Sequence, residues 1–207
     1  MIETEPEAAS LIAGDRINVL RQFTDNLVTH GENLGLIGPR ELERIWTRHI
    51  LNSALLSPFI KTGGGVADIG TGGGMPGLIL AIIRPDAQFR FIEPMERRCV
   101  WLNEQIAELR LTNAIVQRAR AEEVHGAFEV DQVTARAVTA LSKLIPIAAP
   151  LVGKGGELLF LKGQSVHAEV EAAAKQIRKY RLHDITIEEL GAEMLTETTQ
   201  LFRAQIA

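Results

Sequence analysis

The stretch that decides the fold is GVADIGTGGGMPGLILAIIRPDAQFRFIEP, residues 65–94. A short apolar run reaches Asp68, continues into a loop rich in glycine, and becomes a second apolar run that begins beside Pro76. A third apolar run then ends on Glu93. This order predicts a strand, a glycine turn, a helix and a second strand, which together form one βαβ unit. Glycines in such a turn permit positive φ angles and a close approach of the backbone to a ligand.

The alternation of strand and helix continues from this unit toward the C-terminus. The apolar pattern predicts strands at 65–69, 88–93, 113–117, 131–136 and 156–162, and helices at 76–83, 95–110, 141–152 and 165–180. Two more strands, at 184–189 and 199–206, follow with no helix between them. Such a chain belongs to the α/β class, with a mostly parallel sheet covered on both faces and a final hairpin that adds one antiparallel strand.

The N-terminal part of the chain has the apolar spacing of helices. One apolar side of a first helix is predicted to consist of Leu11, Ile17, Leu20, Phe23 and Leu27. Two glycines break that pattern, and a second helix is predicted to start at Pro39 and to end near Pro58. We therefore divide the chain into a helical N-terminal extension, residues 1–60, and an α/β domain, residues 61–207.

The composition limits the class of protein. Apolar residues make up 46% of the 207 residues and charged residues 23%, which is ordinary for a globular protein. No apolar run reaches the roughly 18–20 residues that span a bilayer, and the acidic start lacks the features of a signal peptide, so we expect a cytoplasmic protein. The single cysteine, Cys99, cannot form an internal disulfide, and no cysteine or histidine spacing indicates a metal site.

The glycine loop is compatible with more than one cofactor. Residues 72–77 match the dinucleotide pattern G-x-G-x-x-G, which is a weak signal by itself. Asp68 before Gly70 gives the pattern D-x-G-x-G, and Glu93 ends the second strand, where a carboxylate can accept hydrogen bonds from a ribose diol. No Gly-Lys-Ser/Thr follows the glycines, which argues against phosphoryl transfer.

Five stretches occur in the order of one known family: RHILNS, DIGTGGGMPG, RPDAQFRFIEP, RARAEEV and ARAV. With VGKGGELLFLKG before the end of the fifth strand, the chain resembles class I S-adenosylmethionine-dependent methyltransferases. Within them it is similar to the small-subunit ribosomal RNA methyltransferase G family, also called glucose-inhibited division protein B. The resemblance covers about residues 30–165 and implies a Rossmann-like fold with a seven-stranded sheet.

The resemblance also implies which residues hold S-adenosylmethionine. Five positions match cofactor contacts of the family, Glu93 matches its ribose-binding acid, and three more belong to the loop. The five contacts are Gly70, Met75, Ala121, Glu122 and Arg136, and the loop positions are Asp68, Gly72 and Gly74. The chain departs from the family pattern at Asn52, Gly73 and Met75, where aspartate, proline and leucine are usual.

The substrate is likewise implied by the resemblance. The family methylates ring nitrogen 7 of a guanine in the decoding-region loop of bacterial 16S rRNA, giving 7-methylguanosine. The expected partner is therefore 16S rRNA in the small ribosomal subunit or its precursor, with a monomeric enzyme and no membrane partner. Nitrogen 7 carries a lone pair and no proton, so it can attack a sulfonium methyl without a general base. The sequence contains no obvious base or nucleophile motif, and Arg136 and His49 are candidates for positioning only.

Clustered arginines predict a face that contacts RNA. Arg40, Arg44 and Arg48 are four residues apart and would share one face of a helix. Together with Arg97 and Arg98 they are candidates for contacts to phosphate. The alternative is a solvated face on which neighbouring glutamates balance the arginines.

Three other functions are compatible with parts of the pattern. A methyltransferase of the same fold could act on a small molecule or a protein, and it would transfer methyl groups without RNA. A nicotinamide oxidoreductase could use the glycines at 72–77, and it would bind NAD in place of S-adenosylmethionine. A non-catalytic RNA-binding module could keep the fold, and it would show cofactor affinity without turnover.

Overall fold

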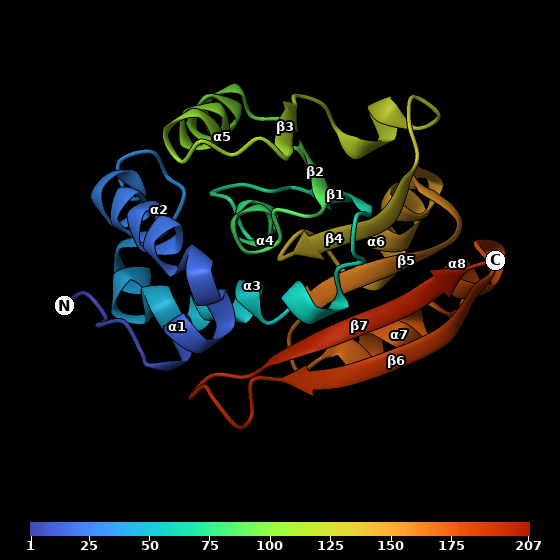
Figure 1. The fold of residues 1–207 in the computed structure, drawn as a ribbon. Coiled ribbons are helices and arrows are strands. Elements are labelled where there is room, and N and C mark those ends of the chain that lie inside the picture. The colour runs from blue at the N-terminus through green and yellow to red at the C-terminus, as the bar shows by residue number, and fades with distance from the viewer.

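The computed structural model describes residues 1–207 and contains one seven-stranded sheet in the order β3-β2-β1-β4-β5-β7-β6 (Figure 1). The strands are β1 (Gly65–Ile69), β2 (Gln88–Ile92), β3 (Ala114–Gln117), β4 (Val130–Arg136), β5 (Val152–Lys162), β6 (Leu182–Leu190) and β7 (Thr199–Ile206). Neighbours among β1 to β5 pair in parallel, whereas β7 pairs antiparallel with both β5 and β6. The predicted sheet, including its one antiparallel strand, is confirmed.

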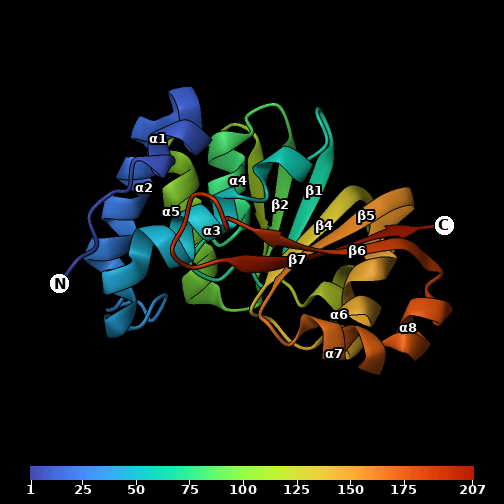
Figure 2. The same cartoon turned by 90° about the horizontal axis from the view of Figure 1, so that it is seen from below.

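Helices cover both faces of the sheet (Figure 2). One face carries α1 (Ala8–Ala13), α2 (Ile17–His30), α3 (Asn52–Ala54), α4 (Gly77–Ile83) and α5 (Glu96–Glu108). The other carries α6 (Leu141–Ala148), α7 (Val166–Ala172) and α8 (Ala174–Lys179). The predicted helix at 165–180 is thus divided at Ala173, and the one at 141–152 ends at Ala148 and continues as a 3₁₀ turn around Pro150.

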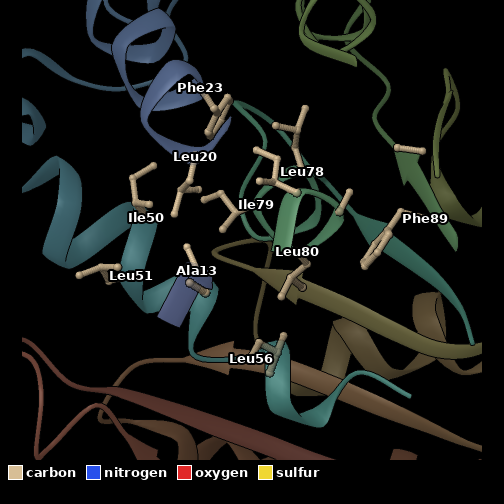
Figure 3. Packing of buried hydrophobic residues seen from close by; sticks show 14 of the residues in the cluster. Ala13, Leu20, Phe23, Ile50, Leu51, Leu56, Leu78, Ile79, Leu80 and Phe89 are labelled. Carbon is tan, nitrogen blue, oxygen red and sulfur yellow. The ribbon is translucent and has the colours of Figure 1, made fainter. Parts of the chain in front are cut away.

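The N-terminal helices share a hydrophobic core with α4 and α5. Leu20 and Phe23 of α2 face Leu78 and Ile79 of α4, and all four side chains are fully buried (Figure 3). Leu11 was predicted to lie on the same apolar side, but it is 79% exposed. The prediction was wrong because α1 ends before the 3₁₀ turn at Gly14–Arg16, so Leu11 and α2 do not belong to one continuous helix.

The predicted second helix, from Pro39 to about Pro58, is not one α-helix. It consists of a 3₁₀ helix at Pro39–Arg44, a π-helix at Ile45–Leu51 and the short α3. Contacts from distant parts of the chain take the place of regular helical hydrogen bonds. The Glu3 carboxylate accepts hydrogen bonds from the backbone N–H of Trp46 (2.8 Å) and Thr47 (3.1 Å). Tertiary structure therefore overrides the local helical pattern here.

Candidate functional site

The glycine loop between β1 and α4 has a backbone that only glycine adopts readily. Gly70, Gly72 and Gly74 have φ angles of 68°, 58° and 113°. A Cβ atom on Gly74 would come within 3.0 Å of the Phe23 ring, because α2 packs directly against the loop. The loop follows the carboxyl end of β1, which is the edge of a parallel sheet where ligands bind.

Asp68 supports this loop from the side of the protein core. It is fully buried, and its carboxylate accepts hydrogen bonds from the Gly77 backbone N–H (3.0 Å) and the Thr134 hydroxyl (2.8 Å). Burial raises the pKa of Asp68 to about 7, although these hydrogen bonds oppose the rise. The carboxylate touches Gly77 so closely that a Cβ there would lie 2.6 Å from an Asp68 oxygen. Asp68 therefore shapes the loop and does not line the hollow above it.

Glu93, just after β2, is joined to the same loop. It is 1% exposed, and its two oxygens accept hydrogen bonds from the backbone N–H groups of Gly72 (3.0 Å) and Met95 (2.9 Å). Each carboxylate oxygen keeps a second lone pair, which can accept a hydrogen bond from a ligand. A guanidinium nitrogen of Arg98 lies 3.9 Å from Glu93, and the buried Nε of Arg98 has no hydrogen-bond partner.

Two hollows meet at Gly70 and contain most of the predicted cofactor contacts. The first, the loop hollow, has a volume of ≈ 230 Å³ and is lined by Leu36, His49, Gly70, Thr71, Gly72, Gly73, Met75, Arg98, Arg136 and Ala137. The second, the apolar hollow of ≈ 180 Å³, includes Ala121, Glu122 and Val138 in its wall. The structure thus brings the expected contacts from four strand ends to one edge of the sheet.

Arg136 and His49 form a fixed pair in the wall of the loop hollow. Arg136 donates hydrogen bonds to the His49 carbonyl (3.1 Å) and the Ser53 hydroxyl (3.0 Å), and it lies 3.2 Å from Nδ1 of His49. Nε2 of His49 lies 2.7 Å from the Glu41 carboxylate. Burial and the charge of Arg136 lower the pKa of His49, and burial lowers the pKa of Arg136 to about 10. At neutral pH, Arg136 is therefore charged, and His49 is neutral with both ring nitrogens in use.

The predicted arginine face is partly neutralised by carboxylates. Arg44 pairs with Glu41 (3.0 Å) and Glu197 (3.3 Å), and Arg48 pairs with the same two residues at 3.3 and 3.1 Å. Arg40 is not part of this cluster, because the 3₁₀ and π-helical turns do not keep the expected four-residue spacing on one face. Two arginines of the predicted set are exposed and have no ion pair, namely Arg40 and Arg97.

A third hollow adjoins the loop hollow and was missed in the sequence. This β4–β5 hollow has a volume of ≈ 270 Å³ and is lined by Arg48, Asn52, Arg136, Ala137, Leu161, Lys162, Gly163, Glu169, Glu197, Thr198 and Thr199. Lys162 donates a hydrogen bond to the Thr139 carbonyl (2.9 Å) and pairs with Glu169 (2.7 Å). The position of Lys162 at the end of the fifth strand could have revealed it, whereas no local signal marks Glu197.

Comparison with known sequences identifies relatives over nearly the whole chain. The family described as rRNA small subunit methyltransferase G matches residues 16–198. A ribosomal RNA small subunit methyltransferase G from Clavibacter michiganensis subsp. michiganensis (strain NCPPB 382) is 55% identical over 207 residues, covering 100% of this chain and 98% of the relative. A protein of the same name from Thermobifida fusca (strain YX) is 42% identical, covering 97% of this chain and 84% of the relative.

Solved structures with low sequence identity share the fold. A SAM-dependent O-methyltransferase from Thermotoga maritima superposes with a TM-score of 0.62 at 15% identity, covering 76% of this chain and 65% of its own. A SAM-dependent methyltransferase from Aquifex aeolicus gives a TM-score of 0.59 at 17% identity, covering 85% of this chain and 98% of its own. The fold is therefore that of class I S-adenosylmethionine-dependent methyltransferases.

Proposed function

The chain belongs to the rRNA small subunit methyltransferase G family, and from this premise we propose how its site methylates ribosomal RNA. The protein transfers the methyl group of S-adenosylmethionine to ring nitrogen 7 of a guanine in the decoding-region loop of 16S rRNA, giving 7-methylguanosine. One observation carries this assignment to the site: Glu93, just after β2, is hydrogen-bonded to Gly72 of the glycine loop. The two elements that would hold opposite parts of a nucleoside are thereby joined.

The residues at this edge fit S-adenosylmethionine. Gly70 and Gly72 add no side chains of their own to the wall of the loop hollow. Glu93 is hydrogen-bonded to Gly72 and keeps free lone pairs, which we assign to the ribose diol. Arg98 lies beside Glu93, and its buried Nε has no hydrogen-bond partner. We therefore assign Arg98 to a contact with the cofactor and not with RNA. Ala121 and the apolar hollow around it suit the adenine ring. When bound, the cofactor supplies a sulfonium methyl group that a lone pair can attack.

The protein groups beside the loop hold position and do not remove a proton. His49 is neutral and bonded at both nitrogens, so it is unavailable as a general base. Nitrogen 7 of guanine has no proton to lose, and the reaction therefore needs alignment of donor and acceptor and exclusion of water. Arg136 supports that alignment, because its hydrogen bonds to His49 and Ser53 fix the wall of the loop hollow.

The RNA contacts are local, since the chain carries a net charge of −4. Arg40 and Arg97 are exposed without carboxylate partners, and we propose that they contact phosphates around the target loop. A guanine inside a folded RNA has to leave its stack before it can enter the site. The proposed substrate is 16S rRNA within the small subunit or its precursor, and the proposed enzyme is a monomer.

The place of action follows from the substrate. Ribosomal RNA is processed where ribosomes are assembled, so we propose the cytoplasm as the location. Among the helices of the chain, none combines the length and the apolar character needed to cross a membrane.

Analysis of modified nucleosides tests this function directly. We expect 16S rRNA from a strain that lacks the protein to lose one 7-methylguanosine. The wild-type gene should restore it, and a Glu93→Ala variant expressed at the same level should restore little. An unchanged content of 7-methylguanosine in the deletion strain would refute the proposed function.

A further inference from the structure

The β4–β5 hollow is the cavity that adjoins the proposed cofactor site. It shares Arg136 and Ala137 with the loop hollow. Methyl transfer needs the reacting atoms within about 3–3.5 Å of each other, so the acceptor has to approach from a neighbouring cavity. Two other hollows are lined by Gly65 and Val130, which begin β1 and β4, and they therefore lie at the opposite edge of the sheet. Only the β4–β5 hollow among these has the required position.

Asn52 presents an unused polar group to this hollow. The residue is 7% exposed, its side chain takes part in no hydrogen bond, and its Oδ1 atom is buried without a partner. Buried polar atoms in proteins are nearly always hydrogen-bonded, so an open one in the wall of a cavity indicates a ligand that completes it. The carboxamide can accept a hydrogen bond through its oxygen and donate one through its nitrogen.

Glu197 contributes an oriented carboxylate to the same hollow. It lies in the β6–β7 loop, which passes beside the N-terminal segment (Figure 1, Figure 2). Arg44 lies 3.3 Å from one carboxylate oxygen and Arg48 lies 3.1 Å from the other. The arginines therefore fix the orientation of the carboxylate, and each oxygen keeps a lone pair for a further donor.

We propose that the β4–β5 hollow receives the target guanine, with Glu197 and Asn52 reading the base edge that carries N1–H and the 2-amino group. A carboxylate accepts from both of these donors, whereas adenine presents an unprotonated nitrogen at position 1 and is repelled. Glu197 and Asn52 line the β4–β5 hollow and are absent from the loop hollow, whereas Arg136 lines both. Because nitrogen 7 lies on the opposite side of a purine from N1 and the 2-amino group, this orientation directs it toward the cofactor. The assignment rests on the proposed function.

Replacement of the target base by inosine tests the proposal. Inosine keeps O6, N1–H and nitrogen 7 but lacks the 2-amino group. Small subunits are reconstituted with 16S rRNA carrying guanine or inosine at the methylated position, and single-turnover rates are measured with saturating S-adenosylmethionine. We expect the wild type to methylate inosine more slowly by roughly tenfold or more. The Glu197→Ala enzyme should methylate both the guanine and the inosine substrate slowly, and its two rates should be similar. Asn52→Ala should be slower on both substrates.

The controls separate recognition from stability and from the proposed function. Glu193→Ala changes an exposed carboxylate in the same loop, without an ion pair, and should leave both rates unchanged. Calorimetry should show unaltered S-adenosylmethionine affinity in Glu197→Ala and Asn52→Ala. Equal wild-type rates on guanine and inosine, or a full inosine defect retained in Glu197→Ala, would overturn this inference alone. No methylation of the guanine subunit by the wild type would overturn the proposed function itself.

Discussion

A single methyl group at Gly77 should disrupt the support of the cofactor loop. Gly77 is the first residue of α4, and its N–H donates to the fully buried carboxylate of Asp68 (3.0 Å). In a Gly77→Ala variant, the new Cβ would lie 2.6 Å from one carboxylate oxygen and 2.8 Å from Cβ of Asp68. Ordinary contacts between such atoms are about 3.5 Å, so either the carboxylate or the helix start has to move by about 1 Å.

The expected loss of stability follows from two destabilising contributions and one stabilising contribution. Overpacking in a core costs about 1–3 kcal/mol, and a weakened hydrogen bond to a carboxylate adds about 1–3 kcal/mol. The better helix propensity of alanine returns about 1 kcal/mol. The free energy of unfolding should therefore fall by about 1–5 kcal/mol, which lowers the melting temperature by about 2–20 °C for a protein of this size. The displaced loop should also raise the dissociation constant for S-adenosylmethionine by about tenfold or more.

Thermal unfolding and calorimetry at pH 8 measure both effects, with Gly65→Ala as the matched control. Gly65 begins β1, and a Cβ there would meet its neighbours at 3.8–3.9 Å, which is an ordinary contact. The control should melt and bind the cofactor as the wild type does. A Gly77→Ala protein as stable as the control, with unchanged cofactor affinity, would refute the role assigned to the contact between Gly77 and Asp68.

Four further predictions follow from the contacts of the site. Glu93→Ala should raise the dissociation constant for S-adenosylmethionine by about 5–150-fold, corresponding to about 1–3 kcal/mol; an unchanged constant in calorimetry removes Glu93 from the site. Because burial raises the pKa of Asp68 to about 7, the folded protein keeps a proton that the unfolded chain releases near pH 4, and the stability from this group is lost as the pH rises toward 7. Asp68→Asn should flatten this part of the stability profile measured by urea unfolding between pH 4 and 8, and an identical profile would contradict the assignment. Single-turnover rates should stay nearly constant from about pH 6 to 9, and His49→Gln should lower them without changing that profile; a pH dependence abolished in the variant would indicate a base. Replacing Arg44 and Arg48 by glutamine should change the slope of the logarithm of RNA affinity against the logarithm of salt concentration by less than about one unit per arginine, because both already pair with carboxylates. A slope that falls by the full two units would show that both arginines contact phosphate.

The sheet and the edge that carries the site were predictable from the sequence. Strands alternate with helices, and the carboxyl ends of parallel strands gather at one edge. The positions of Glu93 and Arg136 at strand ends were therefore sufficient to place both near the glycine loop. The two residues indeed lie at the same edge, after β2 and at the end of β4.

The loop itself was only partly predictable. The pattern of glycines indicated a backbone with positive φ, and Gly70, Gly72 and Gly74 have it. The pattern could not show that Asp68 is buried under the loop, because a carboxylate next to a ligand and one beneath the backbone have the same sequence signal. The buried carboxylate accepts a hydrogen bond from Thr134, which comes from another strand.

The segment from Pro39 to Ala54 shows what only the tertiary structure decided. Its residues have a helical pattern, yet Glu3 holds the backbone of Trp46 and Thr47, and Arg136 holds the carbonyl of His49. These partners lie far away in sequence, and local propensity is too weak to compete with them.

The carboxylate partners of the arginines could not be predicted for the same reason. An arginine next to open solvent and one next to a distant carboxylate look alike in the sequence, and Glu197 reaches Arg44 and Arg48 only because the β6–β7 loop folds back onto the N-terminal segment. The sequence by itself therefore determined the class of fold, the family of the chain and the edge of the sheet where the candidate site lies, since these depend on periodicity and short motifs. The tertiary structure alone decided which charges are neutralised and which cavity adjoins the proposed cofactor site, since these depend on distances between residues that no local pattern relates.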